Sequence, residues 1–214
     1  MWQLLLDFLF PRRSLTGTEG EWITEEERAQ LRADPVILET EQLRRQGFLS
    51  LDRLVAACDY RKVPLVRKAV HTLKYRGTRP MVQELSAFLA SASDHFSLRW
   101  NTTITPVPLH WSRRFRRGFN QAELLARCVA EKLGLTFSNL LQRKRATGSQ
   151  VGRGRVERVG AMKNVFRVRK GEPVPPSVIL VDDICTTGAT MDACAKALKE
   201  AGALFVEGWV VAKD

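Results

Sequence analysis

Short apolar runs alternate with stretches of helical periodicity along most of the chain. Runs that are apolar or β-branched and that end at Pro, Gly or polar residues are typical of strands. Such runs occupy residues 54–58, 102–109, 165–168, 178–181 and 204–211. Apolar positions with the period of a helix occupy residues 64–75, 80–90, 120–133 and 189–201. Alternating strands and helices predict an α/β fold, with a mostly parallel sheet flanked by helices.

The first fifty residues lack this alternation. They predict a small helical N-terminal appendage over residues 1–50, in front of a main domain over residues 51–214. Thr24 and Glu27 have the spacing of a capping box, which begins a helix. A second helix is predicted from Val36 to Arg45.

The cysteines and the extreme N-terminus bear on the cellular compartment. The run Met1–Phe10 is apolar, but no basic residue precedes it and Asp7 interrupts it, which is not the pattern of a signal peptide. No apolar run approaches the ~20 residues that span a bilayer. The 4 cysteines are scattered without a Cys-x-x-Cys pair. These features predict a cytoplasmic protein with free thiols, no membrane span and no zinc site made of cysteines.

The strongest chemical signal follows the apolar run 178–181. Asp182 and Asp183 come directly after this run, and a turn of small residues then leads into a helix. The free amides and the dipole of a helix start favour a bound phosphate. We therefore expect a phosphate site formed by the next residues, Thr186, Thr187, Gly188, Ala189 and Thr190.

The two acids would repel a phosphate, so we expect them to face sugar hydroxyls, as the acid at the ribose of dinucleotide folds does. A phosphate at one end and a diol at the other describe a ribose 5-phosphate. An ordinary strand–turn–helix corner with Asp183 as its cap is the alternative. It accounts for one acid, but not for the second acid, the threonines and the glycine together.

Positive charge is concentrated in the middle of the chain. The net charge is +11, from 34 Lys and Arg against 23 Asp and Glu, yet residues 101–170 alone carry 16 basic and 3 acidic side chains, a net +13. This excess predicts a polyanionic partner, which is a phosphorylated small molecule, a nucleic acid or an anionic membrane surface. The part of the surplus that one phosphorylated small molecule does not need is either a solvated face or a groove for single-stranded nucleic acid. Residues 143–163 are basic, glycine-bearing and without apolar periodicity, which predicts a flexible loop.

Residues 178–190 resemble the phosphoribosyl-pyrophosphate loop of the type I phosphoribosyltransferases. The shared pattern is four apolar residues, two acids, two further apolar residues and Thr-Thr-Gly-x-Thr. The resemblance implies that Asp182 and Asp183 hold the 2- and 3-hydroxyls of the ribose, and that residues 186–190 hold its 5-phosphate. Cys185 stands where an aliphatic residue is more frequent, a mild change because a free cysteine packs as a small hydrophobe.

Further motifs in one order resemble the ComF family of competence-related phosphoribosyltransferase homologues. They are Leu73-Lys74-Tyr75-Arg76-Gly77, Pro106-Val107-Pro108-Leu109-His110 and Arg117-Gly118-Phe119-Asn120-Gln121-Ala122-Glu123-Leu124-Leu125-Ala126, followed by a basic stretch with Arg143, Arg145, Thr147, Gln150, Arg158 and Asn164. This resemblance implies a type I phosphoribosyltransferase fold over residues 51–214. It also implies a link to DNA uptake, with competence-machinery proteins as partners.

By analogy with other type I enzymes, the loop after Pro108 would bind pyrophosphate, and residues 143–163 would close over the ligand. Charge grows on the leaving pyrophosphate during transfer, so cations and Mg²⁺ are needed there. Mg²⁺ held by the ligand's phosphates and by water needs few protein ligands. The candidate residues are Arg113, Arg114, Arg117 and Asn120 for pyrophosphate, Arg143, Lys144, Arg145 and Gln150 in the flexible loop, and Asp182, Asp183 and Arg117 for catalysis.

The N-terminal segment departs from the family pattern. Members of this family commonly begin with a cysteine-rich zinc module, but Ser14 and Gly17 stand where thiols are expected, and no cysteine occurs between residues 1 and 57. We therefore expect a cysteine-free substitute that is held by helix packing. Such a segment would serve as a hood over the acceptor.

Two functions from different classes remain open. The first is a Mg²⁺-dependent phosphoribosyltransferase, which binds phosphoribosyl pyrophosphate or ribose 5-phosphate and transfers phosphoribosyl to an unidentified acceptor. The second is a non-catalytic module that binds single-stranded nucleic acid and assists natural transformation, with Phe115 and Phe119 between arginines to stack on bases. A regulator that binds phosphoribosyl pyrophosphate as an effector is a third option.

Overall fold

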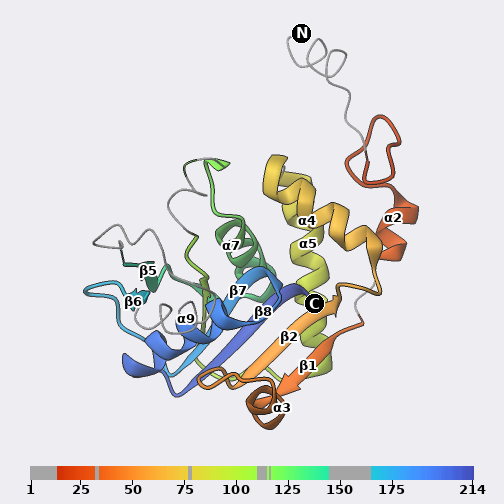
Figure 1. Cartoon of the computed structure of the whole chain (residues 1–214). Helices are drawn as coiled ribbons and strands as arrows, with labels where there is room; N and C mark the ends of the chain where they lie inside the picture. Colours follow the sequence, from red (N-terminus) through yellow and green to blue (C-terminus); the bar gives the residue numbers. More distant parts are fainter. Residues whose placement is uncertain (1–13, 32–33, 77–78, 110–114, 116, 145–164) are drawn as a thin grey trace, which may run out of the picture.

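A six-stranded sheet forms the centre of the computed structural model (Figure 1), which describes residues 14–31, 34–76, 79–109, 115, 117–144 and 165–214. In spatial order its strands are β1 (Val36–Glu39), β2 (Arg53–Asp59), β8 (Phe205–Lys213), β7 (Ser177–Cys185), β3 (Thr102–Pro106) and β4 (Thr136–Phe137). All neighbouring pairs are parallel except β1 with β2.

The remaining described elements are helices and one small antiparallel sheet. The helices are α2 (Glu25–Gln30), α3 (Thr40–Arg45), α4 (Pro64–Arg76), α5 (Arg79–Ala90), the 3-10 helix η1 (Ser91–His95), α7 (Gln121–Leu133) and α9 (Ala189–Glu200). The small sheet pairs β5 (Leu141–Arg143) with β6 (Phe166–Val168).

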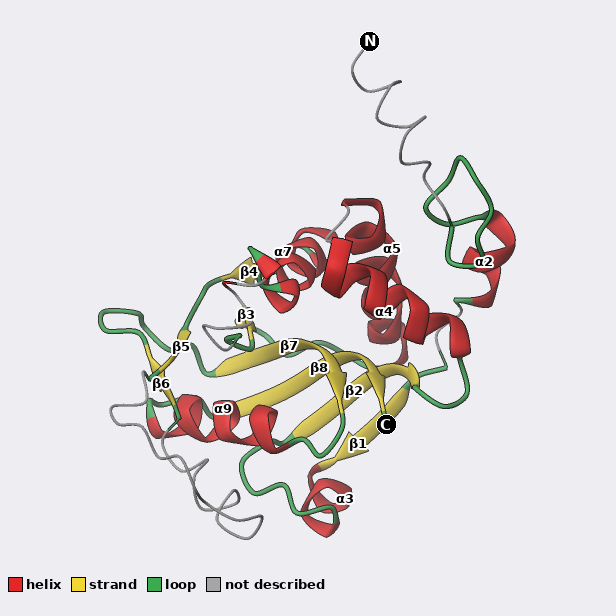
Figure 2. Cartoon of the chain, turned by 45° about the horizontal axis from the view of Figure 1, so that its top comes forward, coloured by secondary structure: helices red, strands yellow, loops and turns green. Residues whose placement is uncertain are grey.

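Helices cover both faces of the main sheet, with α4, α5 and α7 on one side and α9 on the other (Figure 2). Strand β7 shows why. Its residues Ile179 and Val181 pack into the core shared with α4, α5 and α7, whereas Val178 and Leu180 pack into the core shared with α9. Because successive strand residues point to opposite faces, a continuous apolar run is buried on both sides.

The direction of chain progression across the sheet reverses between β3 and β7. From β3 the chain passes through α7 to β4 at one edge, whereas from β7 it passes through α9 to β8 in the opposite direction. The carboxyl ends of these parallel strands share one edge of the sheet. Open α/β sheets bind ligands at such a switch point, outside the carboxyl ends of the strands.

The elements predicted for the main domain are confirmed. The helices α4, α5, α7 and α9 and the strands β2, β3, β6, β7 and β8 lie where the periodicity predicts them. Asn120 caps α7 through its side chain, and Gly134 ends that helix with a φ of 64°. The short strands β4 and β5 escaped prediction, because two or three residues carry no measurable periodicity.

The prediction of a helix from Val36 is wrong for residues 36–39, which form strand β1 at the edge of the main sheet. The helix α3 begins only at Thr40. Val36 and Leu38 pack against the core that includes α9, and pairing with β2 supplies the backbone hydrogen bonds. Tertiary pairing thus overrides a weak local preference. The division of the chain at residue 50 stays a prediction, and β1 contributes to the same sheet as the main domain.

Glu27 ties together the segment that was expected to replace the zinc module. Its Oε1 accepts from Ser14 Oγ at 2.8 Å and from Thr16 N at 2.5 Å, and its Oε2 accepts from Thr24 N at 2.9 Å. Burial alone raises the pKa of Glu27, but the hydrogen bonds from Thr24, Thr16 and Ser14 outweigh it and leave that pKa below its usual value. A buried carboxylate with neutral donors therefore cross-links the loop at the position where thiols were expected.

Candidate functional site

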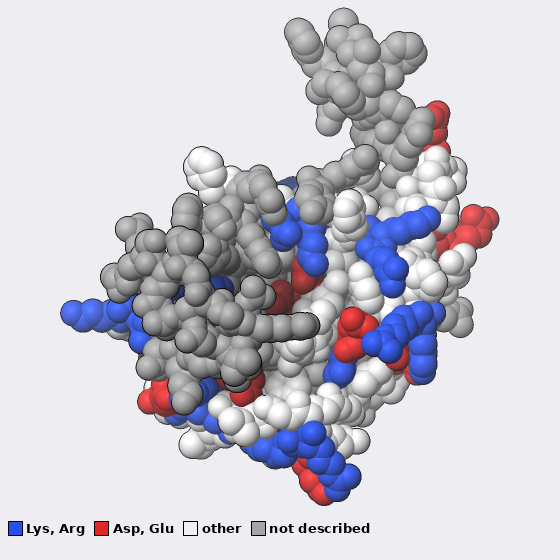
Figure 3. Space-filling model, viewed as in Figure 1, with Lys and Arg blue, Asp and Glu red and all other residues white. Residues whose placement is uncertain are grey.

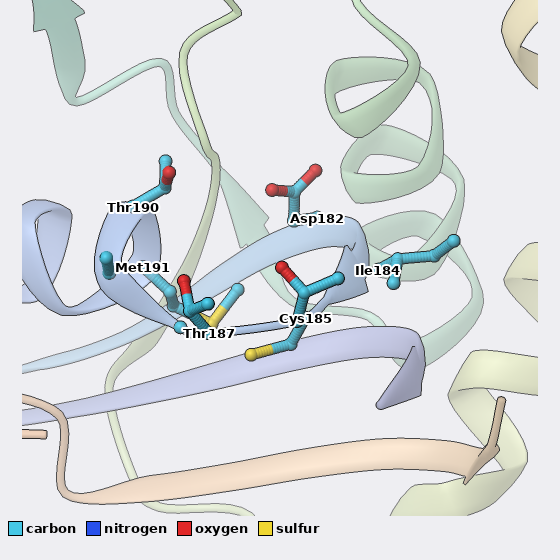
Figure 4. Close-up of a pocket in the computed structure, with 9 residues that line it drawn as sticks. Asp182, Ile184, Cys185, Thr187, Thr190 and Met191 are labelled. Atoms are coloured by element: carbon cyan, nitrogen blue, oxygen red, sulfur yellow. The ribbon is translucent and has the colours of Figure 1, made fainter. Parts of the chain in front are cut away.

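A pocket opens at the carboxyl end of β7, where the strand, the following turn and α9 meet (Figure 4). Its cavity volume is about 70 Å³, well below the roughly 300–1,000 Å³ of sites that enclose a whole ligand, so it has room for one small group such as a phosphate. Its lining residues are Asp182, Ile184, Cys185, Thr186, Thr187, Gly188, Ala189, Thr190 and Met191. Six of the seven residues predicted to hold ribose 5-phosphate thus surround one space, and Asp183 is the exception.

Gly188 shapes the turn from the strand into α9. Its φ of 71° lies in the left-handed region, which favours glycine. A Cβ at this position would lie 2.0 Å from Cζ of the Phe48 ring. Phe48, from the loop that precedes β2, therefore packs directly against the turn that forms the pocket. Backbone conformation and packing independently require glycine here.

Asp192 connects the loop that precedes β2 to α9 through hydrogen bonds. Its Oδ1 accepts the backbone N–H groups of Leu49 at 3.0 Å, Ser50 at 2.7 Å and Leu51 at 3.0 Å. Three amides on one carboxylate hold residues 49–51 against the first turn of the helix. With Phe48 behind Gly188, this arrangement supports the turn of the pocket from within the protein.

Three polar side chains of the pocket lie on one side of it. In Figure 4 the side-chain oxygens of Asp182, Thr187 and Thr190 point to the same side, while the sulfur of Cys185 points away. The hydroxyls and the amides at the start of α9 can donate to an anion, and the Asp182 carboxylate can accept from a hydroxyl. Burial raises the pKa of the Cys185 thiol to about 11, so the thiol is a neutral part of the wall.

Asp183 lies on the other face of β7, with 5% of its surface exposed. Its Oδ2 is 3.1 Å from Lys74 Nζ and 3.1 Å from Gln121 Nε2, and its Oδ1 accepts from Ile184 N at 2.7 Å. Both carboxylate oxygens are therefore already bonded to protein donors. The two acids expected to share one diol do not lie in one pocket.

The loop after β3 rises from the same edge of the sheet. Asn120 closes its base, because Nδ2 donates to Val107 O at 3.2 Å and Oδ1 accepts from Ala122 N at 3.2 Å. Arg117 is half-buried in the segment between β3 and α7, three residues before Asn120. The other two pyrophosphate candidates, Arg113 and Arg114, lie outside the described residues.

Of the predicted flexible loop, two residues are described. Arg143 is the last residue of β5, with its guanidinium carbon 5.4 Å from the centre of the Phe166 ring. The backbone N–H of Lys144 donates to Val165 O at 2.8 Å. Arg145 and Gln150 lie outside the described residues, as does most of the predicted loop.

The oxygen donors of the pocket fit a magnesium ion that keeps most of its water. Mg²⁺ prefers carboxylate, phosphate and water oxygens, and in the part of the chain that the structure describes Asp182 is the one carboxylate that lines the pocket. Among the described residues, no three His, Cys, Asp or Glu side chains gather as a metal cage. Within the same residues, no helix has the length and apolarity needed to cross a membrane.

Sequence reasoning assigned no role to four residues around the pocket. Lys74 and Gln121 stand inside the quoted family motifs, so the motifs marked them without indicating that both contact Asp183. Asp192 is the acid in the first turn of α9, a placement that only suggests a helix-dipole contact. No local pattern in the sequence connects Phe48 with Gly188.

Curated proteins similar to this chain are named for competence or for DNA utilization. Competence protein F of Haemophilus influenzae is 33% identical over 138 residues, 63% of this chain and 60% of that protein. DNA utilization protein YhgH of Salmonella typhimurium is 35% identical over 168 residues, 75% of this chain and 72% of that protein. Competence protein ComFC of Streptococcus pneumoniae is 38% identical over 101 residues, 47% of this chain and 43% of that protein.

The fold places this protein in the class of α/β proteins that have a mostly parallel sheet and a pocket at its topological switch point. No family model matches the chain. The similarity to YhgH covers most of both proteins, so the chain belongs to the family of competence protein F and DNA utilization protein YhgH. The resemblance to the ComF family is thereby confirmed. The chain spans less than two thirds of competence protein F.

Solved structures with phosphoribosyl chemistry in their names are also similar. The glutamine phosphoribosylpyrophosphate amidotransferase of B. subtilis has a TM-score of 0.40 and 19% identity, over 59% of this chain and 25% of that one. The adenine phosphoribosyltransferase of Leishmania tarentolae has a TM-score of 0.39 and 17% identity, over 63% of this chain and 58% of that one.

Proposed function

We propose that the pocket at the end of β7 binds a phosphorylated ribose, and that the protein uses phosphoribosyl pyrophosphate with Mg²⁺ to transfer phosphoribosyl to an acceptor. One observation carries the proposal. A turn of threonines and glycine at a helix start shares a single pocket with the Asp182 carboxylate. The helix start suits a phosphate and the carboxylate suits a sugar hydroxyl.

The chemistry assigns a task to each part of this edge of the sheet. The amides and hydroxyls of residues 187–190 hold the 5-phosphate, and Asp182 accepts from a ribose hydroxyl. The acceptor forms a bond to the anomeric carbon while the bond to pyrophosphate breaks, and both bonding electrons leave with pyrophosphate. Arg117 stabilises the charge that grows on this leaving group. When bound with the ligand, Mg²⁺ supplies further neutralisation of that charge.

Titration calorimetry tests the binding step. We expect phosphoribosyl pyrophosphate with Mg²⁺ and ribose 5-phosphate to bind the wild type, and Asp182→Asn to weaken both about tenfold or more, because it removes a charged acceptor. Asp94→Asn is the matched control, since Asp94 is an exposed acid in η1, and it should leave both affinities unchanged. A wild type that binds neither ligand contradicts the proposal.

A variant of Arg117 tests which end of the ligand this residue binds. We expect Arg117→Ala to lower the affinity for pyrophosphate about tenfold and to leave that for ribose 5-phosphate within about threefold, because the lost cation serves the leaving group. Parallel titrations of wild type and variant measure the two affinities. Equal losses for both ligands would contradict the assignment of the loop after β3.

A second function, binding of single-stranded nucleic acid, is favoured by a specific feature. Phe115 is 90% exposed in the segment between β3 and α7, whose sequence is rich in arginine, and exposed aromatic rings among cations stack on bases. Trp100 is 88% exposed at the opposite end of β3 and provides the control.

Fluorescence anisotropy with a labelled single strand distinguishes the two aromatic residues. If this function holds, Phe115→Ala weakens binding about fivefold or more by loss of stacking, Trp100→Ala does not, and affinity falls steeply with salt. Release of pyrophosphate with a panel of acceptors separates the enzyme from the binding module. Tight binding of phosphoribosyl pyrophosphate without release or nucleic-acid binding would instead indicate an effector site.

A further inference from the structure

Asp183, Lys74 and Gln121 form a closed cluster beside the pocket, built from β7, α4 and α7. Their side chains meet at one atom, Oδ2 of Asp183, which lies 3.1 Å from Lys74 Nζ and 3.1 Å from Gln121 Nε2. The Gln121 side chain is buried and its Oε1 has no hydrogen-bond partner among the described residues. The cluster is thus polar, nearly dry and incompletely satisfied.

We propose that Lys74 is a ligand-binding cation, and that Asp183 is a positioning residue that acts by holding its ammonium group. This inference rests on the proposed phosphoribose site and names a further residue in it. It reverses the expected role of Asp183, which would orient Lys74 rather than bind ribose hydroxyls directly.

The accessibility of the two charges supports this assignment. The Asp183 side chain is 7% exposed and the Lys74 side chain is 24% exposed, so the cation is the member of the pair that solvent and ligands can reach. An ammonium group has three donors, and Asp183 is the partner of Lys74 among the described residues. The carboxylate, by contrast, accepts two hydrogen bonds from the protein and is ion-paired with Lys74, which occupies most of its roughly four lone-pair sites.

The position of the pair indicates which part of the ligand Lys74 would meet. The expected 5-phosphate site lies at the start of α9, which covers one face of the sheet. Lys74 and Gln121 belong to α4 and α7, which cover the other face. A ribose lying across the end of β7, with its 5-phosphate at α9, directs its anomeric carbon toward α4 and α7. The anionic group at that carbon therefore meets Lys74.

The charge distribution agrees with this direction. On the face shown in Figure 3, basic side chains stand beside α4 and acidic side chains lie in the hollow below them.

A buried ion pair contributes little net stability, because desolvation of both charges opposes their attraction. A lysine that served only to join α4 to β7 would therefore add little that an apolar contact could not supply.

Titration calorimetry of Lys74→Gln tests the proposal, because glutamine removes the charge and keeps a donor for Asp183. We expect the affinity for phosphoribosyl pyrophosphate and for pyrophosphate to fall about tenfold or more, the usual effect of losing a charged hydrogen bond, while that for ribose 5-phosphate changes less than about threefold. Lys74→Arg should restore most of the lost affinity. Lys68→Gln is the matched control, on an exposed lysine of the same helix.

A double-variant cycle then separates the two roles of Asp183. If Asp183 acts through Lys74, Asp183→Asn weakens pyrophosphate binding in the wild type but adds less than about threefold in the Lys74→Gln background. Additive losses, or an equal loss of ribose 5-phosphate affinity, would show that Asp183 binds the sugar itself and would overturn the inference. If the wild type binds phosphoribosyl pyrophosphate and Lys74→Gln binds it equally well, the role of Lys74 is overturned and the proposed function stands. If the wild type binds no ligand, both the role of Lys74 and the proposed function are overturned.

Discussion

The two faces of strand β7 use their carboxylates in different ways. On the α9 face, Asp182 is half-buried in an open pocket whose turn is supported by Phe48 and by Asp192. On the α4 face, Asp183 is closed in by a lysine and a glutamine. Strand geometry sends adjacent side chains to opposite faces. Two neighbouring acids of one motif therefore meet different partners and need not share a role.

The two faces also differ in what holds them together. The pocket face depends on shape and on backbone amides, because a ring fills the space behind Gly188 and three N–H groups converge on Asp192. The cluster face depends on opposite charges in a nearly dry site. Changes of shape should consequently damage the pocket, and changes of charge should damage the cluster.

The largest effect is expected from Gly188→Ala on the pocket face. A left-handed backbone costs an alanine roughly 1–2 kcal/mol, and the overlap with Phe48 adds roughly 1–3 kcal/mol of overpacking. We expect the free energy of unfolding, measured in urea, to fall by about 3 kcal/mol, and ribose 5-phosphate binding to be lost.

Gly134→Ala is the matched control for that variant. Its φ of 64° imposes the same backbone strain, but no atom lies within 4 Å of an added Cβ. Gly134→Ala should lower the free energy of unfolding by only about 1–2 kcal/mol and leave ligand binding intact. Equal destabilisation by the two substitutions would show that Phe48 yields without cost, and that the turn is not supported by shape.

A smaller loss is expected from Asp192→Ala, which removes the acceptor of three backbone amides. Hydrogen bonds to a charged group contribute about 1.5–3 kcal/mol, and partial exposure of Asp192 lets water replace part of that. We expect the free energy of unfolding in urea to fall by about 2 kcal/mol and ribose 5-phosphate affinity to fall about fivefold as the turn loosens. Glu200→Ala, an exposed acid at the end of the same helix, should change neither quantity. An unchanged affinity in Asp192→Ala would mean that the turn holds its shape without the contact to residues 49–51.

The contrast between the two faces also explains what could be predicted from the sequence. The strands and helices of the main domain and the pocket turn have local signatures, because apolar period, a glycine and a helix start all act within a few residues. The partners of Asp183 and Gly188 lie 62 to 140 residues away in the chain, at Gln121 and Phe48 among others. Strand β1 was missed for the same reason, since only its pairing with β2 distinguishes it from a helix.

The smallest expected effect concerns Cys185, the pocket residue that departs from the usual pattern of the loop. Burial raises the pKa of its thiol to about 11, above the usual value of about 8.5. The thiolate is the reactive form, so alkylation by iodoacetamide should rise about tenfold per pH unit from pH 8 to pH 10. Because the folded thiol keeps its proton to higher pH than the unfolded one, its contribution to stability declines as pH rises above about 8.5.

Peptide mass spectrometry resolves this reaction from those of the other cysteines. Cys194 is fully buried in the core, so its labelling reports unfolding, and Cys185 should react faster than Cys194 because it is 4% exposed at the end of β7. Cys185→Val should leave ribose 5-phosphate affinity within about threefold, as expected of a residue that acts only as a small hydrophobe. If labelling of Cys185 levels off below pH 9, its thiol is not shielded by burial and the pocket wall is more polar than its packing implies. If instead Cys185→Val abolishes binding, the sulfur meets the ligand and the α9 face does not rely on shape alone.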